Sequence, residues 1–227
     1  MEFFYSIAKS FTAGGAFMYP ILFVGAVAIA ITIERYITLA RMSNRNQRTW
    51  SQVEPVLTSG DFDKVRELTS KDDSPIARVL SMGLAVEGAV RRRDDVEKAM
   101  QESMIEIVPQ LEKRTHYLGT LANVATLLGL LGTVSGLIHA FAAVATVNPA
   151  EKANLLSASI SEAMNCTAFG LMTAVPILLV HAFLQTRQMA LSDGLETAAI
   201  RFLNALSARQ AARAQSRLEL VQQAASA

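Results

Sequence analysis

Three long stretches without a formally charged residue restrict what this chain can fold into. They are Ser10–Ile33, Tyr117–Val147 and Ala163–Thr186. A helix needs about 20 apolar residues to cross the roughly 30 Å hydrocarbon layer of a bilayer, and each stretch is long enough. A helix also satisfies its own backbone hydrogen bonds within lipid, and the sequence shows no alternating strand pattern. We therefore predict an all-α membrane protein with three transmembrane helices.

The composition predicts that much of the chain lies outside the bilayer. Of 227 residues, 51% are hydrophobic and 18% are charged. This is too apolar for an ordinary soluble domain and too charged for a fully embedded transporter. The first apolar stretch is longer than the roughly 7–15 residues of a signal-peptide core, so we expect it to remain as a helix.

Lysine and arginine predict the orientation of the spans. Nineteen of the 21 lie between Arg35 and Arg114 or after Thr186, and the positive-inside rule places those parts in the cytoplasm. The N-terminus is then periplasmic and the C-terminus cytoplasmic. The expected organisation is a periplasmic segment 1–14, transmembrane helices 15–36, 117–147 and 160–186, a cytoplasmic helical region 37–116, a periplasmic loop 148–159 and a cytoplasmic C-terminal helix 187–227.

The cytoplasmic region shows turn signals and helical periodicity. Ser59-Gly60-Asp61 and Asp73-Ser74-Pro75 are typical of turns and divide the region. After them, apolar residues recur every three or four positions and form one helical stripe, namely Val96, Met100, Met104, Ile107 and Leu111. The stretch 117–147 would extend about 46 Å as a helix, so we expect it to leave the bilayer and continue into the helix at 91–114. The last span is expected to continue into the cytoplasm likewise.

Threonines are the first candidate functional residues. Thr133 lies 17 residues before the expected apex of the hairpin at Ala150, and Thr167 lies 17 after it. Two helical arms would place both hydroxyls at nearly the same depth, and Thr126 falls on the same face as Thr133. Such hydroxyls suit a proton or hydrated-ion path, because they donate and accept hydrogen bonds. The alternative is that each hydroxyl only bonds to a backbone carbonyl one turn back.

Glu162 is the second candidate. It lies five residues outward of Thr167, about 7.5 Å along a helix. One hypothesis is an outer-vestibule carboxylate that attracts cations or holds an assembly contact. The alternative is that its charge only stabilises the positive end of a helix dipole.

Glycines and a proline suggest how the spans pack. Gly132 and Gly136 form a G-x-x-x-G pair, and Gly129 lies one turn earlier. Small residues let helices approach closely in lipid, so we expect these glycines to bring a neighbouring helix near Thr133 and to support the oligomer. Pro176 would kink the last span, which is tolerated where neighbours satisfy the freed carbonyl.

No arrangement of residues in the sequence indicates an enzyme. There is no nucleophile–base pair, phosphate-binding loop or metal-ligand spacing, and the single cysteine, Cys166, lies in an apolar segment. We therefore expect neither a cofactor nor a metal.

Three segments together resemble the ExbB/TolQ/MotA proton-channel family, and most closely its three-span ExbB/TolQ branch. They are Gly129–Gly136, Glu162–Leu171 and Ala174-Val175-Pro176. The resemblance extends to the order of spans and the sizes of loops along the whole chain. Four positions depart from the family pattern: Ala125-Thr126 replaces a common Ser-Pro, Ser135 replaces a common Trp, and Cys166 replaces a typical Ala.

The resemblance implies a ring of five copies in the bacterial inner membrane. Its pore is lined by the second and third spans and holds two single-span partners of the ExbD/TolR type, each with one membrane aspartate that carries the proton. Thr133 and Thr167 match the family's pore threonines, and Glu162 matches its outer acid. The chain itself has no aspartate in any expected span.

The function that the resemblance implies is conversion of proton motive force into mechanical work on a periplasmic partner. The leading expectation is an ExbB-like role in TonB-dependent outer-membrane transport. A TolQ-type envelope-maintenance motor or a gliding-type motor is the alternative of the same class. A membrane scaffold that conducts no ions is the alternative of a different class.

Overall fold

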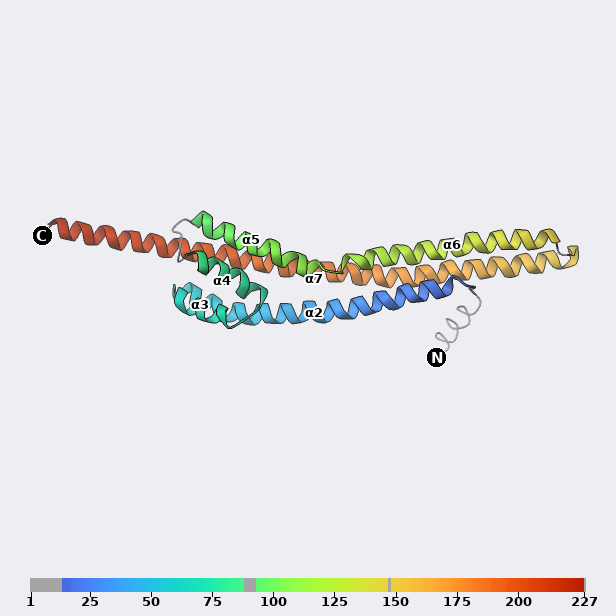
Figure 1. Ribbon diagram of the computed structural model, residues 1–227, viewed down its shortest axis with the longest axis horizontal. Coiled ribbons are helices and arrows are strands. Elements are labelled where there is room, and N and C mark those ends of the chain that lie inside the picture. Colours follow the sequence, from blue (N-terminus) through green and yellow to red (C-terminus); the bar gives the residue numbers. More distant parts are fainter. Residues whose placement is uncertain (1–13, 88–92, 147, 227) are drawn as a thin grey trace. The chain divides into compact units, whose positions relative to one another are not determined.

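All regular elements in residues 14–87, 93–146 and 148–226, which the computed structural model describes, are α-helices (Figure 1). They are α2 (Met18–Thr58), α3 (Phe62–Ser70), α4 (Pro75–Glu87), α5 (Arg93–Glu112), α6 (His116–Thr146) and α7 (Pro149–Ser226). Three stretches, in α2, α5–α6 and α7, are long and apolar enough to cross a membrane. The prediction of an all-α protein with three membrane-length helices is confirmed. The expected periplasmic segment 1–14 lies outside the described residues except for Gly14.

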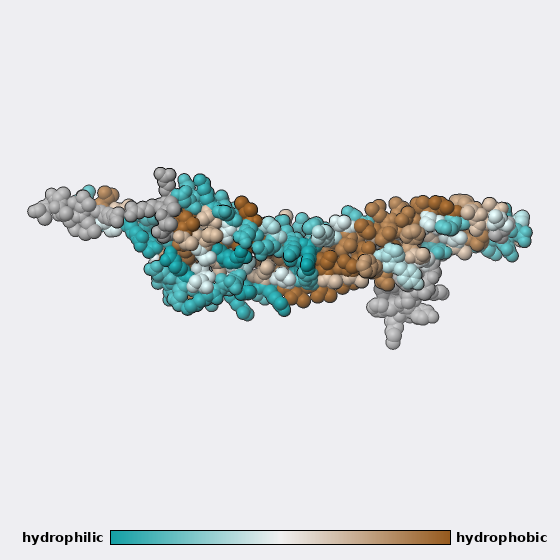
Figure 2. Space-filling model, in the orientation of Figure 1, coloured by the Kyte–Doolittle hydropathy of each residue, from teal (hydrophilic) through white to brown (hydrophobic). Residues whose placement is uncertain are grey.

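The chain divides into two compact units. Unit 1 contains residues 1–36 and 114–185, and unit 2 contains residues 37–113 and 186–227. Figure 2 shows hydrophobic residues gathered over the helices of unit 1 and hydrophilic residues over those of unit 2. Unit 1 therefore contains the three apolar stretches, whereas the face of unit 2 in this view is mainly hydrophilic.

The start of α7 corrects one expectation. We expected a loop over 148–159, but α7 begins at Pro149, so all but the first residue of that segment are helical. Proline is favoured at the first helical position because it lacks only an N–H that would have no helical partner. The carbonyl of Asn148 accepts the N–H of Glu151 at 3.0 Å, and the carboxylate of Glu151 lies in the first turn, where the helix dipole favours it.

A turn separates α5 from α6, where we expected the helix to continue. Arg114 has a φ of 66°, a left-handed conformation that is uncommon outside glycine. Its Nη1 donates to both carboxylate oxygens of Glu34 in α2, at 2.5 and 2.7 Å. The charge pair holds this turn against α2 within unit 1.

Unit 2 folds at the turns that the sequence predicts. The first turn contains Gly60, with a φ of 77°, and Asp61, whose carboxylate accepts the N–H of Lys64 at 3.1 Å and caps α3. The α5 stripe is buried at Val96, Met100, Ile107 and Leu111, and Met104 is half-buried. The fully buried ring of Phe202 in α7 packs edge-on against Phe62. These contacts join α3 and α7 in one core.

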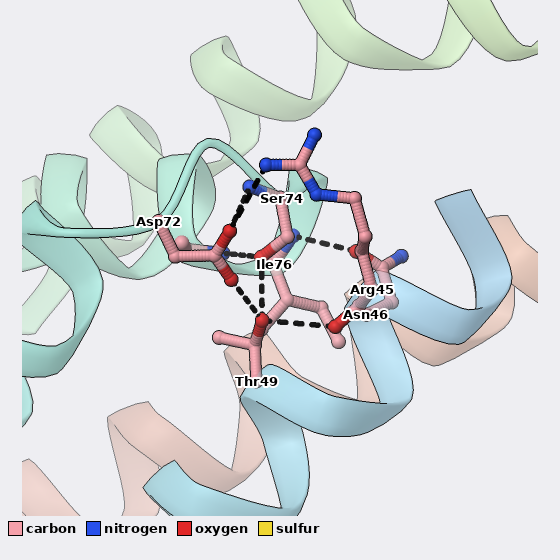
Figure 3. A network of polar contacts seen from close by, with 7 residues as sticks. Arg45, Asn46, Thr49, Asp72, Ser74 and Ile76 are labelled. Carbon is pink, nitrogen blue, oxygen red and sulfur yellow. Dashed lines mark hydrogen bonds and ion pairs between the residues drawn. The ribbon is translucent and has the colours of Figure 1, made fainter. Parts of the chain in front are cut away.

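Polar contacts fix the α3–α4 turn on α2, as Figure 3 shows. The Thr49 hydroxyl contacts the Asp72 carboxylate and lies 2.9 Å from the Ser74 hydroxyl. Asp72 also accepts the Ser74 N–H at 3.1 Å and pairs with Arg45 at 3.4 Å. Partial burial opposes the charge of Asp72, but the hydrogen bonds from Thr49 and Ser74 and the charge of Arg45 outweigh it and lower the pKa of that carboxyl.

Loss of the Asp72 charge is expected to weaken unit 2 in acid. A carboxyl with a lowered folded pKa contributes stability that is fully present above its unfolded pKa and is lost as pH falls through the folded value. We expect Asp72→Asn to lower the free energy of unfolding by about 1–2 kcal/mol at neutral pH, and to flatten its decline below about pH 4. Thermal melting of the detergent-solubilised protein against pH measures both effects. Asp73→Asn, at an exposed position, is the control, and equal melting of the two variants would contradict the role of Asp72.

Candidate functional site in the α6–α7 hairpin

Small residues line the buried face between α6 and the first part of α7. On α6 the buried small residues are Ala122, Ala125, Gly129, Gly132 and Ala140, and on α7 they are Ala163, Cys166, Gly170 and Ala174. Most recur at intervals of three or four, which places them on one helix face. Because no long side chain intervenes, the two helices approach closely. We call this contact the small-residue seam.

Two glycines bring backbone against backbone at the centre of the seam. A Cβ added to Gly170 would lie 2.8 Å from the carbonyl oxygen of Ala125 and 3.0 Å from the Cα of Gly129. A Cβ added to Gly129 would lie 3.2 Å from the Cα of Thr167. Sequence reasoning missed Gly170, although the spacing of Ala163, Cys166, Gly170 and Ala174 was the signal that could have found it.

The other predicted glycines face the same seam. Gly132 packs against the Cys166 side chain, and a Cβ on Gly136 would lie 2.9 Å from the Cβ of Ala163. The helix that these glycines bring close is therefore α7 of the same chain. Their role in an oligomer stays a prediction.

Thr167 differs from the other two threonines in its hydrogen bond. The hydroxyls of Thr126 and Thr133 donate to carbonyls of their own helix, those of Ala122 at 3.1 Å and Leu130 at 2.6 Å. These two bonds match the alternative in which a hydroxyl only bonds to a backbone carbonyl one turn back in its own helix. The Thr167 hydroxyl instead donates across the seam to the Gly129 carbonyl at 2.8 Å.

The three threonine hydroxyls share one chemical property. Each donates its hydrogen to a carbonyl, so its oxygen lone pairs remain as acceptors. Lone-pair acceptors favour a proton carrier or another cation over an anion.

The Gly129 carbonyl that receives the Thr167 hydrogen bond is also the usual helical acceptor for the N–H of residue 133, four positions on. The seam thus links Thr167 to the backbone of Thr133.

Glu162 lines a pocket at the hairpin end of unit 1. The pocket has a volume of about 280 Å³ and is lined by Gly14, Gly15, Ala16, Phe17, Gly132, Ser135, Gly136, His139, Ser159, Glu162 and Ala163. The Glu162 carboxylate lies against Gly15, whose φ is 75° and whose missing side chain leaves the necessary space. His139 also lines the pocket, and its Nδ1 donates a hydrogen bond to the Ser135 carbonyl at 2.7 Å.

The position of Glu162 excludes one alternative. Because α7 begins at Pro149, Glu162 lies about 3.6 turns inside the helix. The helix dipole acts within the first turn, so the hypothesis that Glu162 only stabilises a helix start is wrong.

The helix α7 also continues without a break through Pro176, whose missing N–H leaves the Met172 carbonyl without its usual helical donor.

A comparison with known protein families identifies the family to which this chain belongs. The model of the MotA/TolQ/ExbB proton channel family matches residues 71–197, which is more than half of the chain and includes the whole seam. The chain belongs to the MotA/TolQ/ExbB proton channel family. The resemblance found in the sequence is confirmed, and with its three apolar helices the chain is a multi-pass inner-membrane protein and a channel subunit of the ExbB/TolQ type.

Curated relatives match most of the chain or its central part. Putative biopolymer transport protein ExbB-like 3 of Synechocystis is 31% identical over 79% of this chain and 86% of its own length. Biopolymer transport protein ExbB of Neisseria gonorrhoeae is 25% identical over 81% of this chain and 89% of its own length. Tol-Pal system protein TolQ of Haemophilus influenzae is 35% identical over 42% of each chain. These relatives are named as transport and Tol-Pal proteins, and none is named as an enzyme.

Proposed function

We propose that this channel subunit is an ExbB-like motor component, which converts proton motive force into mechanical work on a periplasmic partner. The hydrogen bond from Thr167 to Gly129 carries the proposal, because it joins the two helices of the hairpin through a hydroxyl whose lone pairs remain as acceptors. One charge that crosses 100 mV releases about 2.3 kcal/mol, so several protons supply enough energy for a mechanical step.

The chain needs a partner that carries the proton. Its three apolar spans contain no aspartate, and a threonine hydroxyl does not hold a proton as an acid–base group at neutral pH. We propose a single-span chain of the ExbD/TolR type that supplies a membrane aspartate. Thr126, Thr133 and Thr167 then present lone pairs along its path, and Glu162 attracts cations to the outer end.

The assembly that suits this function is a ring. We propose five copies around the partner, with the N-terminus in the periplasm and the C-terminus in the cytoplasm. The glycines of the seam and the proline of α7 shape each hairpin of that ring. The orientation rests on the 19 lysines and arginines that lie on one side of the spans.

The proposed branch is TonB-dependent outer-membrane transport. Relatives that match about four fifths of the chain have ExbB-type names, which supports this branch. A TolQ-type motor is the alternative, because the TolQ of Haemophilus influenzae has the higher identity over a shorter part. A gliding-type motor belongs to the same class, and a non-conducting scaffold is the alternative of a different class.

Native mass spectrometry of the complex, isolated from its own membrane by a tag on this chain, tests the proposal. We expect a mass of five copies together with a small single-span, aspartate-bearing chain. Further proteins in the complex would identify the branch. A monomer or dimer in several mild detergents would contradict the motor and favour the scaffold.

A further inference from the structure

Unit 2 contains a pocket that the proton-channel function does not use. It has a volume of about 330 Å³, within the range of small-molecule sites. One face of α2 supplies Ser43, Asn46, Gln47 and Trp50, α4 supplies Ile76, and one face of α7 supplies Ala190, Leu191, Gly194, Thr197, Ala198 and Arg201. The spacing of three and four residues on both long helices makes these faces continuous.

Gly194 lies at the exposed rim of this pocket. A Cβ added there would meet no atom within 4 Å, in contrast to the glycines of the small-residue seam. Glycine within a helix costs about 0.5–1 kcal/mol relative to alanine. Close helix packing does not explain this cost, since nothing packs against Gly194. The space that it leaves is the observation to be explained.

The polar lining of the pocket includes N–H donors and one guanidinium, that of Arg201, which forms an ion pair with Glu54. Arg201 is the only formally charged side chain in the lining, and its guanidinium lies 5.9 Å from the Trp50 ring centroid. Its Nη1 donates to Glu54, which lies outside the lining, and a guanidinium has five N–H donors in all. The buried Asn46 accepts the Ile76 N–H through Oδ1 at 3.3 Å, so its NH₂ group remains a donor.

We propose that this pocket binds a small organic anion through a carboxylate or phosphate group. Arg201 and the amide groups of Asn46 and Gln47 bind the anionic oxygens, because guanidinium and amide N–H groups match them in charge and geometry. The indole of Trp50 and the side chains of Leu191 and Ile76 contact a compact apolar body. The proposal is independent of the pore assignment, since no residue of the hairpin takes part.

Trp50 makes the site directly measurable. It is the only tryptophan in the chain, so intrinsic fluorescence reports on this pocket alone. The full chain in a non-ionic detergent is titrated with phenyl phosphate, with benzoate and with the neutral analogue benzyl alcohol. We expect a saturable change of Trp50 emission with at least one anion and none with the alcohol. No saturable change with either anion, or equal binding of the alcohol, would overturn the proposal.

Two variants test the location of the site. Gly194→Leu places a side chain at the pocket, where the first added carbon meets no atom within 4 Å, and Arg201→Gln removes the charge but keeps donors. We expect Arg201→Gln to weaken binding of the anion at least about tenfold, because a hydrogen bond to a charged group is worth about that factor or more. We expect Gly194→Leu to weaken it as well, because the leucine side chain occupies volume that the bound anion needs. Unchanged binding in both variants would overturn the assignment. Melting temperatures identify a variant that fails to fold. In that case the binding measured with the other variant tests the location of the site.

The natural source of the anion is a lipid headgroup or a free metabolite, and the bilayer distinguishes them. The titration is repeated in nanodiscs of phosphatidylglycerol and of phosphatidylcholine. At an ionic strength that screens the charge of the bilayer surface, weaker apparent binding of the probe in the anionic lipid alone would identify a headgroup as the competing occupant. Equal binding in both would identify a free anion.

Discussion

Thr167→Val is expected to reduce proton conduction about 10- to 100-fold while the protein stays folded. Valine has nearly the shape of threonine but removes the hydroxyl that donates to the Gly129 carbonyl. A neutral hydrogen bond contributes about 1 kcal/mol to stability, so assembly is expected to survive. A lone-pair contact to a passing cation is worth about 1.5–3 kcal/mol, and its loss raises the barrier by the corresponding factor. Flux into liposomes that contain the complex with its single-span partner, followed with a pH-sensitive dye, measures the change.

Thr167→Ser is the matched control for that experiment. Serine keeps the hydroxyl and loses only a methyl group, so conduction is expected to remain within a few-fold of the natural protein. Thr133→Val is expected to behave like Thr167→Val, with normal assembly and lost conduction. Intact conduction in both valine variants would refute the pore assignment. Undiminished function in sodium-free medium would exclude sodium coupling.

Gly170→Ala is expected to disrupt the hairpin itself. The added methyl group would lie 2.8 Å from the Ala125 carbonyl oxygen and 3.0 Å from the Gly129 Cα, and neither backbone can rotate away as a side chain does. The helices must separate, which lengthens the hydrogen bond from Thr167 to Gly129. Overpacking of this kind costs about 1–3 kcal/mol, and we expect the upper end of that range. A fall in melting temperature of the solubilised protein, together with lost conduction, is the measurement.

Gly194→Ala, in the same helix, is the control for this prediction. Nothing lies within 4 Å of the added methyl group, so alanine is expected to stabilise the helix by about 0.5–1 kcal/mol. The two substitutions are chemically identical and should move the melting temperature in opposite directions. Equal melting of the two variants would show that the seam does not control stability.

Features with a local signal could be predicted from the sequence. Charge-free length identified the three membrane helices, because the hydrocarbon layer sets a minimum that few other segments reach. Gly60 and Asp61 identified the turn before α3, because the turn requires a left-handed residue and a capping carboxylate there. The spacing of Val96 and Met100 identified the buried face of α5.

Features that depend on the register of two helices could not be predicted in this way. The partner of Thr167 is Gly129, one turn from Thr133, and a shift of one residue along α7 would change that contact. The turn at Arg114 contains no glycine or proline that would have predicted it, and its charge pair with Glu34 depends on a residue 80 positions earlier. The early start of α7 was missed because Asn148-Pro149 was interpreted as the loop apex rather than as the first helical turn.

The buried position of Cys166 has a practical consequence for mapping the topology of this protein. The chain has no other cysteine, and this one is only 1% exposed, against Gly132 within the seam. A membrane-impermeant maleimide cannot reach it, so the natural chain provides its own unlabelled background. A single cysteine introduced at the exposed Ala153 or at the exposed Ala212 would then report, by its labelling in intact spheroplasts, which side of the membrane each helix end occupies. No residue of the small-residue seam would need to be replaced for that experiment.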